Sequence, residues 1–208
     1  MSHRPASDHG FTPREAARLR RLSPPWKIQR FLDEEVAYDV EGKAFRSPRR
    51  VLRDRVARCL DGALFAAAAL RMQGYPPLVV DLEAVFDSDH VLAVFRSDSG
   101  WGAIARSNYS GLRYREPIHR TLRELVVTYF ESYFNLRREK TLRTFSRPVD
   151  LSRFDRRGWM TTEEELVFVA EHLLRVPHTR LLTPAAERRL ATVDGRMFAA
   201  GLVGRTGH

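Results

Sequence analysis

The segment from Leu60 to Met72 constrains the fold of this chain more than any other. It reads LDGALFAAAALRM and consists largely of Ala and Leu, the strongest helix formers. Gly74 follows at a position where a left-handed cap ends helices readily. Because the helix carries apolar side chains of its own on nearly every side, we expect it to be the central, buried helix of the protein.

The longest uninterrupted apolar run, Ala63 to Leu70, has eight residues. A membrane-spanning helix needs roughly 18 or more, so the sequence predicts no membrane span. The opening residues, MSHRPASDHG, have no apolar stretch that could serve as the core of a secretory signal. We therefore expect a cytoplasmic protein.

Three strands are predicted after the central helix. Residues 77–85 contain a Leu-Val-Val run, residues 90–95 read HVLAVF, and residues 101–105 follow the turn SDSG. The turn predicts a hairpin between the second and third strands. We expect an α+β fold in which the central helix packs on a small antiparallel sheet.

Further helices are predicted from capping signals. Thr12-Pro13 and Ser47-Pro48 each place a cap before a proline, the usual start of a helix. The first of these helices runs to Leu22, and residues 26–36 form another. Capping boxes open two later helices, one after Thr121 with an apolar stripe to residue 133, and one after Thr162 with a stripe to residue 174.

The length of 208 residues suits one domain. We expect that domain to span residues 12–198, with flexible tails at residues 1–11 and 199–208.

The net charge of +9 would suit a polyanion partner. However, 32 of the 35 basic residues are arginines spread along the whole chain, and no basic and aromatic motif of a nucleic-acid reader is visible. This pattern favours a composition bias over a nucleic-acid groove.

Cys59 is the only cysteine, which rules out an intrachain disulfide and a cysteine-rich zinc site. It stands at the start of the central helix. A thiol there faces unpaired backbone N–H groups and the positive end of the helix dipole, and a nearby imidazolium would further favour the thiolate. The competing interpretation is that Cys59 is a small buried hydrophobic residue.

His90 begins a predicted strand that we expect to lie against the central helix. From there its imidazole could reach the helix end and form a thiol acyl-transfer pair with Cys59. A structural histidine that caps the preceding turn is the alternative. Asp87, Asp89 and His90 also resemble metal ligands in type, but the other histidines lack paired spacing, so we predict no metal site and no cofactor.

In a thiol triad a third polar group orients the imidazole. Asn108 follows the strand at 101–105 and is the better candidate, with Ser107 as the alternative. The backbone N–H of Cys59 is a candidate oxyanion donor. Asp54 and Asp61 flank the cysteine, and we interpret them as a surface residue and a helix N-terminal charge.

Three segments in this order resemble the core of the transglutaminase-like superfamily: RCLDGALFAAAALRMQGYPPLVVDL, DSDHVLAVF and SGWGAIARSNY. The likeness to bacterial proteins of this superfamily extends over nearly the whole chain. It implies a papain-like architecture with Cys59 as nucleophile and His90 as general base or imidazolium partner. In papain itself roughly 130 or more residues separate the two. Members usually carry an Asp in the strand after the Trp, where this chain has Ala105.

The resemblance implies a cysteine-dependent acyl transfer or an amide or peptide hydrolysis, with a protein or peptide as substrate. The alternative is a catalytically inactive module of the same fold that binds a peptide or protein partner, and Ala105 motivates it. A nucleic-acid contact through arginines is the third and less favoured hypothesis.

Overall fold

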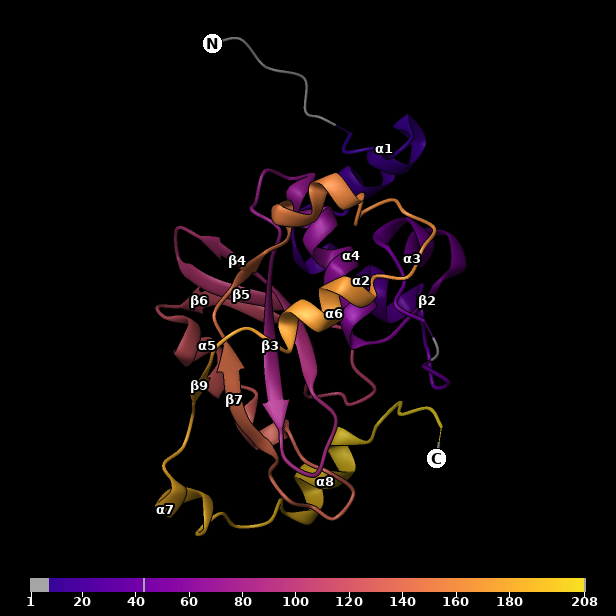
Figure 1. Cartoon of the computed structure of the whole chain (residues 1–208). Helices are drawn as coiled ribbons and strands as arrows, with labels where there is room; N and C mark the ends of the chain where they lie inside the picture. Colours follow the sequence, from indigo (N-terminus) through magenta and orange to yellow (C-terminus); the bar gives the residue numbers. More distant parts are fainter. Residues whose placement is uncertain (1–7, 43, 208) are drawn as a thin grey trace.

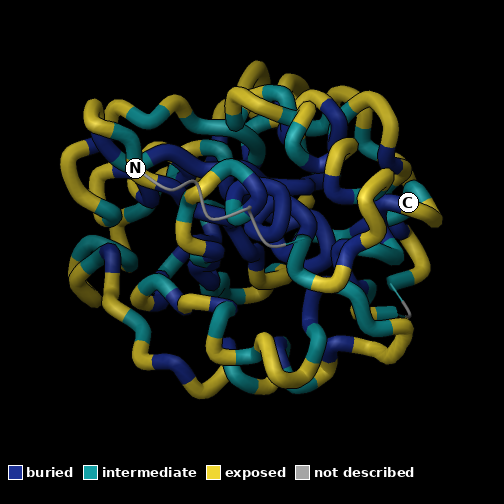
Figure 2. Tube along the Cα trace, turned by 90° about the horizontal axis from the view of Figure 1, so that it is seen from above, coloured by how far each residue is buried: buried dark blue, intermediate teal, exposed yellow. Residues whose placement is uncertain are grey.

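The computed structural model describes residues 8–42 and 44–207. Helix α4 (Cys59–Arg71) lies at its centre, and every residue from Leu60 to Leu70 is buried. This confirms the central helix predicted from composition. In Figure 2 the buried segments gather in the middle of the molecule, inside a rim of exposed loops.

A mostly antiparallel sheet packs against α4. Its strand order is β6-β5-β4-β3-β7-β9, with β8 paired to β3. The strands are β3 (Leu78–Ala84), β4 (His90–Ser97), β5 (Gly100–Ile104), β6 (Arg115–His119), β7 (Leu142–Ser146), β8 (Val149–Asp150) and β9 (His178–Arg180). The hairpin predicted between the second and third strands is present as β4 and β5, with Ser97 opposite Gly100. The fold is therefore α+β, as expected, although only three of these strands were predicted.

Both faces of the sheet are covered. Along β4, Val91 and Ala93 face α4, whereas Leu92 and Val94 belong to a second apolar cluster with α5 (Leu122–Val127). This alternation follows from the two-residue period of a strand. Figure 1 shows α4 and the N-terminal helices on one side of the sheet. No helix in the described part of the chain is long and apolar enough to cross a membrane.

The N-terminal helices are α1 (Pro13–Arg21), α2 (Trp26–Glu34) and α3 (Pro48–Asp54). Thr12 and Ser47 cap α1 and α3 with their hydroxyls, as the two cap-and-proline signals predicted. Strand β1 (Ala37–Tyr38) follows α2 and strand β2 (Val56–Ala57) follows α3 along the chain, and the two strands form a short parallel pair.

We expected a loose tail at residues 1–11. Residues 1–7 lie outside the described part of the chain, so only residues 8–11 test this expectation. Among residues 8–11, Gly10 is exposed, residues 8 and 9 are half-buried and Phe11 is buried. Phe11 is buried in the core around α4, and its N–H donates to the carbonyl of Asp8. The apolar ring of Phe11 anchors this stretch.

Helix α5 is shorter than predicted. It is capped by Thr121 as expected but ends at Val127, and a 3₁₀ turn (Phe130–Ser132) follows in place of a continuous helix to residue 133. The Thr128 hydroxyl donates to the Leu125 carbonyl at 2.7 Å, a local bond that competes with helix propagation. The predicted stripe is nevertheless core, since Tyr129 is fully buried.

Helix α6 (Val167–Leu173) begins later than predicted, so the capping box assigned to Thr162 and Glu165 was wrong. The Thr162 hydroxyl instead accepts from the N–H of Glu164 in a local turn. Glu163 pairs with Arg53 of α3 at 2.9 Å, before the helix begins.

The chain continues through α7 (Pro184–Glu187) to α8 (Gly195–Gly201) at the lower end of Figure 1. The tail expected from residue 199 thus begins inside a helix. Hydrogen bonds tie this region to the loop after β5: the N–H of Ser110 donates to the Gly201 carbonyl, and Asn108 bonds to Thr206.

Candidate active site

Cys59 is the first residue of α4, as predicted. The short β1–β2 pair ends at Ala57, and Arg58 is extended, so the helix starts abruptly at the cysteine. The Asp61 carboxylate accepts the N–H of Arg58 at 3.1 Å and that of Arg46 at 2.9 Å. Burial raises the pKa of Asp61 to about 6. This carboxylate is therefore a helix cap, which agrees with its predicted role as an N-terminal charge.

The Cys59 sulfur lies at an open edge of β4. Strand β5 pairs with β4 only as far as Ala93, which leaves the backbone of residues 89–91 without a strand partner on that side. Sγ is 3.9 Å from the Asp89 carbonyl oxygen and within reach of the Val91 N–H. Burial raises the pKa of the partly exposed thiol despite these N–H contacts. The helix N-terminus thus does not produce the resting thiolate that the sequence suggested.

His90 begins β4 and is buried, 5% exposed. Its ring lies on the α5 face of the sheet, 6.4 Å from the ring of Tyr133 between centroids. Burial lowers the pKa of His90 to about 4, and a hydrogen bond with the Leu112 backbone acts in the opposite direction. Nε2 is buried and has no hydrogen-bond partner among the described residues. The imidazole is therefore neutral at physiological pH.

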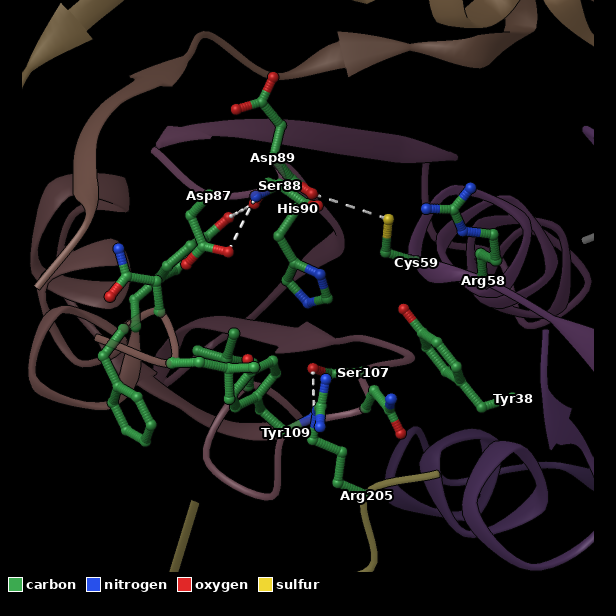
Figure 3. A pocket seen from close by; sticks show the side chains of 16 residues that line it. Tyr38, Arg58, Cys59, Asp87, Ser88, Asp89, His90, Ser107, Tyr109 and Arg205 are labelled. Atoms are coloured by element: carbon green, nitrogen blue, oxygen red, sulfur yellow. Dashed lines mark hydrogen bonds between the residues drawn. The ribbon is translucent and has the colours of Figure 1, made fainter. Parts of the chain in front are cut away.

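Cys59 and His90 line one pocket of about 350 Å³ (Figure 3). The pocket forms where β5 ends, so that α4 contributes one wall and the first residue of β4 another. In the part of the chain that the structure describes, no hydrogen bond joins Sγ to the imidazole, and the sulfur bonds to the Asp89 carbonyl instead. The fold brings the two predicted residues to one cavity without making them a hydrogen-bonded pair.

Asn108 does not orient His90, which corrects the role predicted for it. Its amide donates to the Thr206 carbonyl at 2.7 Å and accepts the Thr206 N–H at 2.9 Å, so both ends are engaged elsewhere. Ser107, the alternative, also lines the pocket, and its Oγ accepts the N–H of Tyr109. The imidazole hydrogen-bonds to the backbone of Leu112 instead.

The backbone of Ala105, just after β5, is held by Gln29. The Ala105 N–H donates to Oε1 at 3.0 Å, and Nε2 donates to the Ala105 carbonyl at 2.9 Å. Gln29 is buried, and the sequence analysis missed it. A polar residue between Ile28 and Phe31 on the buried face of α2 was the available signal.

Several residues of the pocket were also missed. Tyr38, from β1, has its pKa raised by burial and by the nearby thiol. The remaining polar residues that line the pocket and were not singled out before are Arg58, Ser88, Tyr109, Tyr133, Asn135 and Arg205. Asp87 and Asp89, considered as metal ligands, line it as well, but no three His, Cys, Asp or Glu side chains converge on one point within residues 8–42 and 44–207.

Many arginines pair with carboxylates within the protein. Examples are Arg49 with Glu15 and Arg71 with Asp155. Others lie over aromatic rings, as Arg115 does over Tyr129. These contacts give the arginines structural roles in several elements, in keeping with their spread along the sequence.

Comparison of the sequence with protein-family models gave no match, and comparison with curated proteins gave none either.

Proposed function

We propose that this pocket carries out cysteine-dependent acyl transfer or amide hydrolysis, with Cys59 as nucleophile and His90 as general base in a transglutaminase-like, papain-like arrangement. One observation carries the proposal. The only thiol of the chain, at the first residue of α4, and a buried imidazole at the first residue of β4 line the same pocket. Nε2 of this imidazole has no hydrogen-bond partner in the described part of the chain.

The electrostatics of the pocket favour general-base catalysis over a resting ion pair. The pKa of the thiol is raised and that of His90 is lowered to about 4, so both groups are neutral before substrate binds. Each unit by which the pKa of the thiol exceeds that of the imidazole opposes transfer of the proton from Cys59 to His90 by about 1.4 kcal/mol. The proton therefore leaves the sulfur as the bond to the carbonyl carbon forms, when the developing charge moves to the carbonyl oxygen.

The reaction then follows thiol acyl chemistry. Sγ of Cys59 attacks the carbonyl carbon of the substrate, and His90 receives the thiol proton. The amine leaves with that proton, and a thioester on Cys59 remains. Water or another amine then gives a proton to His90 and attacks the thioester carbonyl. The acyl group passes to this acceptor as the C–S bond breaks, and the Cys59 sulfur takes the proton back from His90. The N–H of Cys59 at the first helical position has no acceptor within its helix and supports the oxyanion.

Acylation by an activated ester tests this proposal directly. Intact-mass spectrometry should detect one acyl group, and peptide mapping should place it on Cys59. We expect His90→Gln to slow acylation about 100-fold or more, the usual contribution of a positioned base. Asp87→Asn, a change at another residue of the same pocket, is the matched control and should react nearly as the unaltered chain does. Equal rates in the His90→Gln variant and the unaltered chain would overturn the proposal.

A second function, binding without catalysis, is favoured by a separate observation. The Cys59 sulfur bonds to the Asp89 carbonyl, not to His90, and Ala105 replaces the usual acid. In this case the pocket would hold a peptide or protein partner, and the Cys59 thiol would serve only to hydrogen-bond the backbone carbonyl of Asp89, just before β4. The absence of any acyl adduct on Cys59, together with saturable binding of a peptide, would establish this alternative.

A further inference from the structure

The loop after β5 holds a segment of the chain itself in the way that a binding site holds a peptide. Asn108 donates from Nδ2 to the Thr206 carbonyl at 2.7 Å and accepts the Thr206 N–H on Oδ1 at 2.9 Å. These are the two backbone groups that a neighbouring strand residue would bond. Asn108 thus binds mainly the backbone of residue 206. The Thr206 hydroxyl adds one longer hydrogen bond to Oδ1 of Asn108, at 3.3 Å.

The segment forms part of the wall of two adjoining cavities. A second cavity, of about 680 Å³, adjoins the catalytic pocket, and the two share Tyr38, Ser107 and Asn108 as lining residues. Arg205 lines the pocket of Cys59, whereas Thr206 lines the adjoining cavity. Thr206, which is bonded to Asn108, and Arg205 before it therefore lie at the junction between the two cavities.

Arg205 forms part of the wall of the catalytic pocket. Figure 3 shows its side chain directed towards Ser107 and Tyr109, and its guanidinium carbon is 5.9 Å from the centre of the Tyr109 ring. Its Nε is buried without a hydrogen-bond partner in the described part of the chain. A long basic side chain thus enters the pocket one residue before the backbone that Asn108 holds.

We infer that Asn108 is the backbone clamp of a subsite for an extended polypeptide, and that residues 205–207 occupy this subsite as an intramolecular competitor of the substrate. This inference rests on the proposed function for the identity of the substrate but not for the binding itself. A peptide binds at the junction when the segment leaves, with its backbone on Asn108 and its preceding side chain in the pocket of Cys59. Occupation by the segment lowers the apparent affinity for any such peptide.

Peptide binding in a Cys59→Ser background tests this without any covalent chemistry. The probe is a fluorescein-labelled LVGRTG peptide, which repeats residues 202–207, and the measurement is fluorescence polarisation. Thr206→Pro removes the N–H that bonds to Asn108, whereas Thr206→Ala keeps it and serves as the matched control. We expect Thr206→Pro to bind the probe about tenfold more tightly than the background protein, and Thr206→Ala to bind it nearly as the background does.

Two further comparisons make the test specific. Adding Asn108→Ala to the Thr206→Pro variant should weaken binding about tenfold or more, because the clamp is lost. A probe with proline in place of its threonine should bind less well, because it lacks the N–H. Thermal unfolding of each variant checks that the fold is intact.

The inference is overturned if Thr206→Pro binds the probe no better than Thr206→Ala, if Asn108→Ala leaves that binding unchanged, or if no variant binds. These outcomes are independent of acyl transfer. If the probe binds as expected but Cys59 is not acylated, the proposed catalysis fails and the subsite stands. If Cys59 is acylated at the same rate in Thr206→Pro and Thr206→Ala, and neither binds the probe, the reverse holds.

Discussion

Replacement of Gln29 by leucine should destabilise the protein strongly, because Gln29 satisfies both backbone groups of Ala105 in a buried place. The side chain is 6% exposed, and its two bonds to Ala105 measure 2.9 and 3.0 Å. A buried polar group that loses its partner costs about 1–3 kcal/mol. Two such groups, offset in part by the added apolar burial, give a loss of about 3 kcal/mol.

For a domain of this size, that loss lowers the midpoint of thermal unfolding by roughly 6–12 °C. Urea unfolding followed by circular dichroism measures the free energy. Gln73→Leu is the matched control, because Gln73 makes one bond to the backbone, from Nε2 to the Leu22 carbonyl, and is only partly buried. Its replacement should cost about 1 kcal/mol. If Gln29→Leu lowers the free energy of unfolding no more than Gln73→Leu does, the two hydrogen bonds between Gln29 and Ala105 do not stabilise the protein as argued.

Two other predictions concern packing and pH. Gly62→Ala should destabilise the protein by about 1–3 kcal/mol, because the added Cβ would lie 2.3 Å from Cβ of Arg106, although alanine has the higher helix propensity. Gly195→Ala, with open space around the added carbon, should not destabilise it; equal losses in urea unfolding would refute the steric argument. Burial raises the pKa of Asp81 to about 6, so the folded state binds its proton more tightly than the unfolded state does. The contribution of Asp81 to the free energy of unfolding should therefore fall as pH rises from about 4 to 6. The difference in unfolding free energy between Asp81→Asn and the unaltered chain should change over that range, and a difference that does not depend on pH would contradict the argument.

The sequence by itself determined the elements that depend on local preferences. The Ala-rich run fixed the central helix, the hydroxyl caps fixed the starts of α1, α3 and α5, and the SDSG turn fixed the β4–β5 hairpin. Cys59 at the start of α4 followed from the same signals, because helix propensity and capping act between residues a few positions apart.

Only the tertiary structure decided how the site is assembled. Asn108 bonds to Thr206, 98 residues away, and Gln29 holds Ala105 across 76 residues. The face of β4 that carries His90 and the low pKa of its imidazole depend on what packs around that strand end. No local pattern encodes these contacts, because a polar side chain takes its partner from whichever backbone groups the folded chain leaves unpaired beside it.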